Sequence, residues 1–215
     1  MTAADSGEYD DLRRQVVDEA TQLRAWCSSV VAMEDGEHDR WDCIHEAFLQ
    51  FVLACSGATW DAEVIDAVLF LIAWDSESEV LADVLAQQAS CLIVLADAAV
   101  DCAEPHARWQ LADRLGDQHD QISRVEPLLM RYARDADEYV RRRAILALAR
   151  LGSGQVERIA EQAWNRGHEY ERMAVLSALS ELGSPRLQEY LVRAMSDGDC
   201  HLAARASAIQ SSLAD

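Results

Sequence analysis

Two segments of the chain repeat each other at a spacing of 31 residues. Residues 139–153 read YVRRRAILALARLGS and residues 170–184 read YERMAVLSALSELGS, so that Tyr, Ala, Leu, Gly and Ser recur in register. A fixed period of this length is typical of stacked helix pairs, because one pair cannot bury its apolar face alone. The repeat therefore predicts an all-α fold, namely an α-solenoid of stacked antiparallel helix pairs in a single continuous superhelix.

Turn residues divide the C-terminal half into helix pairs. Leu-Gly ends the second helix of a repeat, since Gly suits the left-handed conformation that follows a helix. Glu126-Pro127 is expected to open the first helix, because Pro is tolerated in a first turn. The expected pairs cover residues 126–151, 155–182 and 186–213, and residues 104–215 form the repeat region.

The N-terminal half, residues 1–103, has helical periodicity without a readable repeat. Helices are expected over residues 8–33, 38–56, 60–74 and 77–101, the last being one helix or two with a break near Gln88. No segment alternates with a period of two, so no sheet is expected. We expect both halves to form one continuous domain.

Charge is distributed unevenly along the chain, whose formal net charge is −19. Residues 1–103 carry 21 acidic residues and four Arg, whereas residues 104–215 carry 17 acidic residues and 15 Arg. A strong negative field repels nucleic acid and attracts cationic partners. The acidic half therefore predicts a basic protein partner and argues against nucleic acid.

Residues 135–153 resemble a HEAT repeat, with Asp before the second helix, then Val-Arg, then Ala and Leu at helical spacing and a final Leu-Gly. Residues 168–184 are similar, and the short unit looks most like the bacterial HEAT-like repeats of phycobilin lyases. The resemblance implies a fold and not one activity, since such proteins include scaffolds, inhibitors, regulators, chromophore lyases and DNA glycosylases.

The resemblance also implies structural roles for residues that match between the repeats. Arg141 and Arg172 are each expected to pair with an Asp of the preceding turn. The alternative is a ladder of Arg side chains aimed at carboxylates or phosphates. The structural repeat positions are Arg141, Arg172, Leu148, Leu179, Gly152 and Gly183.

The densest polar cluster of the sequence lies between residues 33 and 46. Its acidic side chains, together with the Trp-Asp pairs at two expected helix starts, predict a partner-binding surface with exposed aromatic anchors. We assign to this surface Glu34, Asp35, Glu37, Asp39, Trp41, Asp42, Glu46, Trp60 and Asp61. The helical positions of Trp74, Trp109 and Trp164 predict burial in the core.

A metal site at Glu34, His38, Asp42 and His45 is the competing interpretation of this cluster. The spacing allows it on a helix, but a di-iron site needs two ExxH elements on separate helices and the cluster has one DxxH. Acidic residues also stabilise a helix N-terminus through its dipole. We therefore expect no metal and no cofactor.

The sequence contains no recognisable catalytic motif. It has no GxSxG, no Cys or Ser with an evident base, and no phosphate-binding Gly loop. It favours a non-enzymatic protein-binding module, such as an inhibitor or immunity-type protein that captures a basic partner. The alternatives are a helical-repeat DNA glycosylase, which needs a basic groove, and a tetrapyrrole lyase.

The N-terminus lacks the pattern of a secretory signal, and no apolar run approaches the length that spans a bilayer. We therefore expect a cytoplasmic protein without membrane contact.

Overall fold

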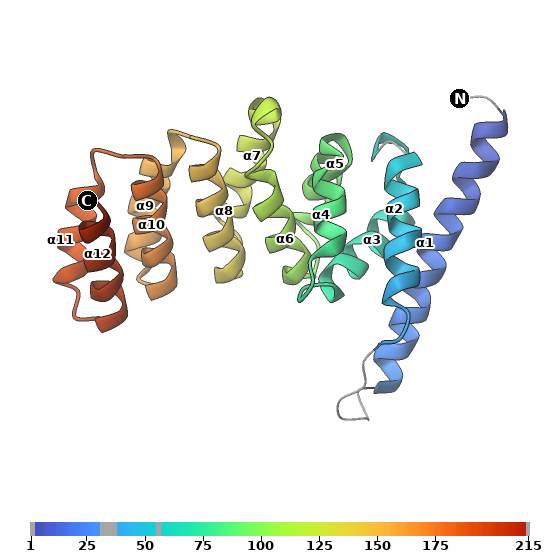
Figure 1. Cartoon of the computed structure of the whole chain (residues 1–215), viewed down its shortest axis with the longest axis horizontal. Coiled ribbons are helices and arrows are strands. Elements are labelled where there is room, and N and C mark those ends of the chain that lie inside the picture. Colours follow the sequence, from blue (N-terminus) through green and yellow to red (C-terminus); the bar gives the residue numbers. More distant parts are fainter. Residues whose placement is uncertain (1–2, 31–37, 55–56, 214–215) are drawn as a thin grey trace. The chain divides into compact units, whose positions relative to one another are not determined.

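The structure, a computed structural model (Figure 1), describes residues 3–30, 38–54 and 57–213. These residues form twelve α-helices and no strand. The first six are α1 (Ala3–Val30), α2 (Trp41–Ala54), α3 (Ala62–Trp74), α4 (Val80–Ala86), α5 (Ala89–Ala99) and α6 (Pro105–Leu115). The others are α7 (Ile122–Tyr132), α8 (Glu138–Arg150), α9 (Gln155–Arg166), α10 (Glu169–Glu181), α11 (Leu187–Met195) and α12 (Cys200–Ser212). None of the described helices is long and apolar enough to cross a membrane.

The chain divides into two compact units, Met1–Leu111 and Ala112–Asp215, whose boundary falls within α6. We call them the N-terminal unit and the C-terminal unit. Each is built from stacked helix pairs, which confirms the predicted all-α solenoid. The single superhelix and the division after residue 103 stay predictions.

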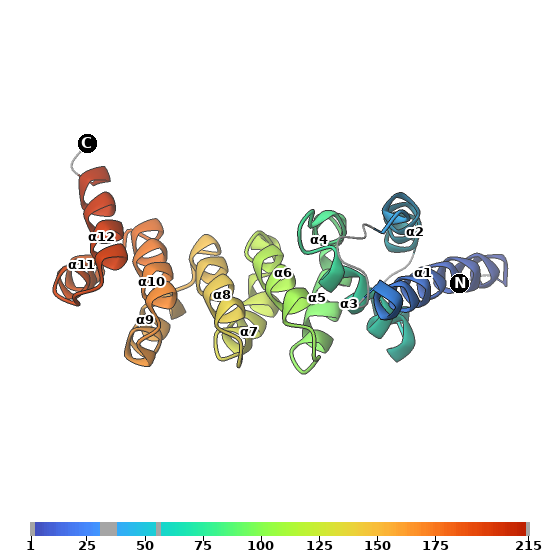
Figure 2. The ribbon, with the colours of Figure 1, turned by 90° about the horizontal axis from the view of Figure 1, so that it is seen from below.

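In the N-terminal unit, α1 packs on α2 and α3, and α2 packs on α4. Figure 2 shows α2 and α4 in one row of this unit and α1 and α3 in the other. Apolar residues at helical spacing explain the packing of α2, because Ile44, Phe48 and Phe51 are all fully buried. The segment predicted as one helix or two over residues 77–101 is two helices, interrupted between Ala86 and Ala89.

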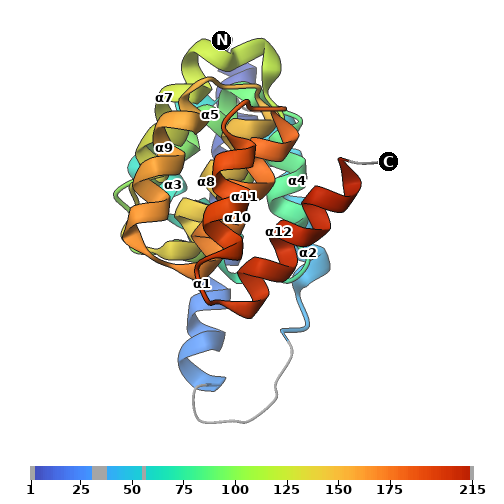
Figure 3. The same ribbon diagram turned by 90° about the vertical axis from the view of Figure 1, so that its left-hand side faces the viewer.

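In the C-terminal unit, Figure 2 shows α8, α10 and α12 in one row and α7, α9 and α11 in the other. Figure 3 shows α7 and α9 on one side of α8 and α10. The apolar face of each pair is buried against its neighbours. Leu148 of α8 and Leu179 of α10 have no exposed surface, and they occupy matching places in their repeats.

The start of α7 differs from the prediction. The helix begins at Ile122, after a short 3-10 helix (His119–Gln121), so Glu126-Pro127 does not open it. Pro127 lies inside the helix and removes one i to i−4 hydrogen bond. Its side chain is exposed, on a face where water can satisfy the carbonyl that Pro leaves unpaired.

The Gly and Ser of the repeat both have a structural explanation. Gly152 and Gly183 follow α8 and α10 with φ values of +69° and +61°, a conformation that other residues adopt at a cost. The Ser153 hydroxyl donates to Glu126 of α7 over 2.5 Å, and the Ser184 hydroxyl donates to Glu157 of α9 over 2.6 Å. We call this contact the Ser–Glu clasp, and it joins the end of each second helix to the first helix of the same pair.

Both matching Arg residues form ion pairs within the C-terminal unit, but their carboxylate partners differ from the predicted Asp of the preceding turn. Nε and Nη2 of Arg141 donate to Glu171 of the next pair, each over 3.0 Å, while Nη1 donates to the carbonyls of Asp135 and Ala136. Arg172 instead pairs with Asp197 over 2.6 Å.

The two Arg residues have different partners because the second helix of the following pair carries a different residue at the matching position. Glu171 is fully buried at the position that Val140 and Leu202, also fully buried, occupy in the flanking pairs. Arg141 therefore finds a carboxylate 30 residues ahead. The residue that matches Glu171 in the next pair is Leu202, which offers no carboxylate, and Arg172 pairs with Asp197 in the loop before α12.

Candidate functional site

A run of neighbouring aromatic rings crosses the N-terminal unit, and we call it the aromatic array. Successive ring centroids lie between 5.0 and 6.5 Å apart. The members are, in order, Phe70, Trp74, Trp26, His38, Trp41 and His45. Contacts at these distances stabilise the array beyond the burial of its apolar area. The array joins the C-terminal end of α3, the second half of α1 and the first turns of α2.

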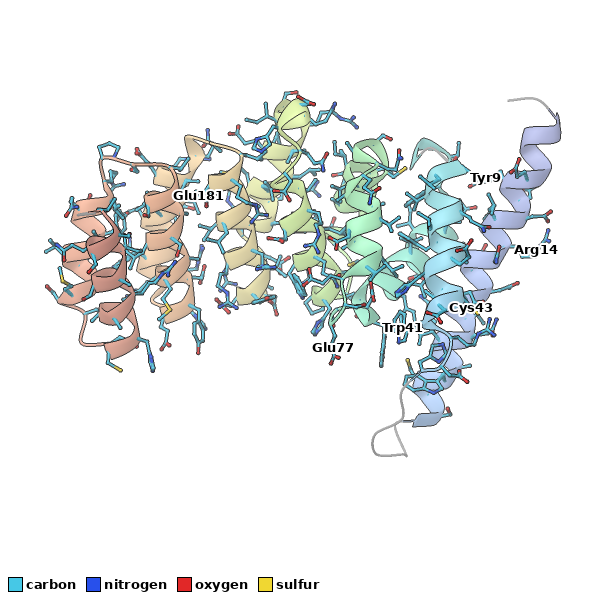
Figure 4. The ribbon with its side chains drawn as sticks, in the orientation of Figure 1. Tyr9, Arg14, Trp41, Cys43, Glu77 and Glu181 are labelled. Carbon is cyan, nitrogen blue, oxygen red and sulfur yellow. The ribbon has the colours of Figure 1, made fainter. Side chains whose placement is uncertain are left out.

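Two hollows open on either side of Trp74, whose side chain is 44% exposed. The Trp41 hollow, of about 310 Å³, is lined by Trp41, His45, Trp74, Asp75, Glu77 and Ser78. The Glu104 hollow, of about 370 Å³, is lined by Ala73, Trp74, Ser76, Glu77, Glu104 and His106. Trp74 and Glu77 line both, and Figure 4 shows Glu77 and Trp41 along the same edge of the N-terminal unit.

One buried carboxylate holds the loop that lines the two hollows. Asp75 is 2% exposed and accepts from the Leu81 amide over 2.8 Å and from the Ser78 hydroxyl. Nε2 of His45 lies 3.5 Å from the same carboxylate. The loop ends at Glu79, whose φ of 56° is left-handed and costs on the order of 1 kcal/mol for a residue other than Gly. The chain thus bends sharply between α3 and α4, and Glu77 projects at the mouth of both hollows.

The surface around the hollows is strongly negative. Asp42, Glu46 and Glu77 are exposed, and the sequence carries no Arg or Lys between residues 41 and 103. The four Arg residues that precede this stretch are each paired with other carboxylates of the N-terminal unit. Their partners are Asp61 and Glu63 for Arg13, Asp11 for Arg14, Asp66 for Arg24 and Glu19 for Arg40. No cationic side chain between residues 41 and 103 therefore neutralises the exposed carboxylates beside the aromatic array, and the surface stays negative.

The structure brings only part of the predicted partner-binding surface to this site. Asp39, Asp42 and Glu46 are exposed, and Trp41 is half-buried within the aromatic array. Three of the predicted residues, Glu34, Asp35 and Glu37, lie outside the described residues.

Trp60 is not the exposed anchor that the sequence predicts. Its side chain is 7% exposed and packs on Phe51 with 5.1 Å between ring centroids. It precedes the N-cap of α3, where apolar side chains commonly turn back onto the core. The neighbouring Asp61 is that N-cap: it accepts from the Val64 amide over 3.0 Å and pairs with Arg13. The Val64 amide, and after it Arg13, hold the pKa of Asp61 below its usual value.

Trp74 shows the opposite error, since its helical position predicts burial. As the last residue of α3 it has no further helical turn to cover it. Trp109 and Trp164, which lie inside their helices, are 7% and 5% exposed as predicted. Sequence reasoning also missed Glu77, Glu104 and His106. The available signal was a Trp directly before the acidic run Asp-Ser-Glu-Ser-Glu at residues 75–79.

Of the four residues of the alternative metal site, the structure describes His38, Asp42 and His45, which are not arranged to hold a metal ion. His38 packs between Trp26 and Trp41, while His45 faces Asp75. Asp42 is exposed, and Glu34 lies outside the described residues. In the part of the chain that the structure describes, no three His, Cys, Asp or Glu side chains are arranged to hold a metal ion.

Comparison with known families agrees with the helical architecture. The family model for HEAT repeats matches residues 92–161 and 125–212, which together make up more than half of the chain. No curated protein matches the sequence. Stacks of such repeats present extended surfaces for protein interaction. The chain is thus a helical-repeat protein-interaction module, and it belongs to the HEAT-repeat family.

Proposed function

We propose that the chain is a non-enzymatic module that captures a basic protein through the acidic face of its N-terminal unit. The observation that carries this proposal is the acidic, aromatic surface on α2 and the loop between α3 and α4. The exposed carboxylates Asp42, Glu46 and Glu77 lie on the segments that carry the half-buried Trp41 and the exposed Trp74. The sequence has no Arg or Lys between residues 41 and 103. Large aromatic side chains dominate the energetics of protein interfaces, and complementary charge speeds association.

The charge of this surface also separates binding of a protein from binding of DNA. A protein that binds duplex DNA neutralises phosphates with Lys and Arg side chains. The α2 face carries Asp42 and Glu46, which repel phosphates. The charge of this surface therefore favours a cationic protein as the partner and argues against a DNA glycosylase, which must bind phosphates.

A matched pair of triple variants tests the proposal. The first changes Asp39, Asp42 and Glu46 to Lys, and the second changes Asp117, Asp120 and Glu181 of the C-terminal unit to Lys. Both variants alter the net charge equally, and all six residues are exposed. The probe is a fluorescent twelve-residue peptide of alternating Arg and Gly, followed by anisotropy.

We expect only the first triple variant to weaken binding strongly. Binding should also weaken as ionic strength rises from about 0.01 M to about 0.15 M, since the Debye length shrinks from about 30 Å to about 8 Å. Equal losses in both variants would show that the net charge, and not this face, attracts the peptide. Tighter binding of duplex DNA than of the peptide would contradict the proposal outright.

The inhibitor form of the proposal has a test of its own. An immunity-type protein binds its target in a stoichiometric complex and abolishes the target's activity. We expect the partner to be a basic enzyme, such as a nuclease, encoded beside this chain. Titration of that enzyme should reach full inhibition at one equivalent, and the Asp39, Asp42 and Glu46 variant should shift the titration. A neighbouring product that stays active in excess of this chain would remove the inhibitor role and leave the binding role.

A further inference from the structure

The two hollows beside Trp74 offer a more specific prediction, which rests on the proposed capture of a basic partner. We propose that they receive an arginine side chain of that partner. Its guanidinium would stack on the exposed Trp74 ring and donate to Glu77 or Glu104. Each hollow is about ten times larger than the ~30 Å³ share of one water molecule, which leaves room for a side chain that enters from solvent.

The aromatic array already holds one guanidinium of this protein in the same manner. The guanidinium carbon of Arg24 lies 4.5 Å from the centroid of Phe70, and its Nη2 pairs with Asp66 over 2.7 Å. Phe70 is the ring next to Trp74 in the array, with 6.0 Å between centroids. A ring and a nearby carboxylate are thus sufficient to fix an Arg at this end of α3.

Trp74 provides the same combination in an exposed position. Its indole is the strongest cation-binding ring among the natural side chains. Glu77 lines both hollows together with Trp74, and Glu104 lines one of them. Among the described residues, no guanidinium lies over Trp41 or Trp74, and no ion pair involves Glu77 or Glu104.

The shape of the site favours arginine over lysine. A guanidinium is planar, so it can lie flat on the indole while its edge donates to a carboxylate. It is also less strongly hydrated than an ammonium, which lowers the cost of leaving water for an open hollow. An ammonium would retain more of its water and gain mainly from the general negative field.

Three peptides of one length separate these contributions. Each has a single central Arg, Lys or citrulline among Gly and Ser residues, with two flanking Lys to supply the long-range attraction. Citrulline keeps the planar shape without the charge. Binding is measured by quenching of intrinsic Trp fluorescence and by calorimetry. We expect the Arg peptide to bind about tenfold more tightly than the Lys peptide, since a partly desolvated cation–π contact has this magnitude.

Three variants place the preference at Trp74. Trp74→Leu keeps an apolar side chain against Trp26 and Phe70 and should abolish the Arg preference. Glu77→Gln removes a carboxylate that makes no described hydrogen bond and should reduce the preference without affecting folding. Tyr170→Leu, in the C-terminal unit and 48% exposed, is the matched aromatic control and should change nothing. Circular dichroism checks that each variant is folded.

The outcomes distinguish this inference from the function on which it rests. Equal binding of Arg and Lys peptides, unchanged in Trp74→Leu, would overturn the arginine site while the capture of basic proteins still stands. Loss of the preference for the Arg peptide in Trp74→Leu, with a reduced preference in Glu77→Gln and no change in Tyr170→Leu, would support the arginine site. Failure of every cationic peptide to bind at low ionic strength would overturn both.

Discussion

Arg141 and Glu171 form a bidentate ion pair that joins two consecutive helix pairs of the C-terminal unit. The carboxylate is fully buried and also accepts from Arg166 over 2.8 Å. Burial alone would raise the pKa of Glu171, but hydrogen bonds from Arg141 and Arg166 outweigh it and hold the pKa below its usual value. A buried charge of this kind is stable only while its partners remain.

Replacing Glu171 with Gln should therefore destabilise the protein. The change leaves two guanidinium groups without their carboxylate, and loss of one partner of a buried pair costs about 3 kcal/mol or more. Urea denaturation measures the free energy of unfolding. The matched control is Glu181→Gln on the exposed surface of the same helix, which should cost less than about 0.5 kcal/mol. Similar costs for the two variants would contradict a stabilising role for the buried pair.

The hydrogen bond between Tyr190 and Glu161, 2.8 Å long, predicts a pH dependence at both ends of the scale. Hydrogen bonds from Tyr190 and then Arg193 lower the pKa of Glu161 from 4.5 to about 2. Its contribution to the free energy of unfolding is therefore complete above pH 4.5 and is lost as the pH falls toward about 2. Burial, and then the bond to Glu161, raise the pKa of Tyr190 from 10.0 to about 12. The contribution of Tyr190 to the free energy of unfolding is complete below pH 10.0 and is lost as the pH rises through about 12.

Tyr190→Phe tests the alkaline part directly. It should lower stability at neutral pH by about 1 kcal/mol, the usual net value of a hydrogen bond, and should flatten the loss between pH 10 and pH 12. The chain has no Lys, so no ammonium side chain titrates in that window. Tyr170→Phe, at an exposed position, serves as the control. If the alkaline slope of Tyr190→Phe equals that of the wild type, the bond does not control it.

Two neighbouring glycines should respond in opposite ways to Ala. Gly152 has φ +69°, so Gly152→Ala should cost about 1 kcal/mol of backbone strain although no atom lies close. Gly154 has φ −65° and open space around it, so Gly154→Ala should be neutral or should stabilise by up to about 1 kcal/mol. Thermal melting of the two variants measures the difference. Equal melting temperatures would contradict the left-handed cap after α8.

A charged residue at the repeated Leu should abolish folding. Leu148 and Leu179 have no exposed surface, and an unpaired carboxylate in such a place costs more than a small domain can sustain. We expect Leu148→Asp and Leu179→Asp to lose the cooperative unfolding transition followed by circular dichroism. Leu53→Asp, at a position 62% exposed on α2, should keep it. A normal transition in Leu148→Asp would mean that the repeat register is wrong.

The C-terminal helices could be predicted closely from the sequence because their end signals are local. The helix pair expected over residues 155–182 is α9 (Gln155–Arg166) and α10 (Glu169–Glu181), and Gly152 and Gly183 end their helices as the left-handed cap predicts. Pro127 misled the prediction of α7, since a Pro that suits a first turn can also sit on the exposed face of a longer helix.

The partner of Arg141 could not be predicted from neighbouring residues. Glu171 lies 30 residues away, and only the apolar Val140 and Leu202 at the matching places mark its position as buried. The exposure of the two Trp side chains could not be predicted either, because Trp60 and Trp74 lie at the two ends of the helix predicted over residues 60–74. At a helix end, burial depends on which neighbouring helix covers the side chain, and the sequence without repeats does not reveal that neighbour.

The Ser–Glu clasp has a consequence for how such a chain can grow. Each clasp closes within one pair, so a duplicated segment covering residues 154–184 would carry a complete copy of it. Arg172 of the first copy would then face a second Glu171, the partner that Arg141 has now, in place of Leu202. The length of the C-terminal unit is therefore open to change by whole modules, and the acidic N-terminal surface could be kept while the repeat array is extended.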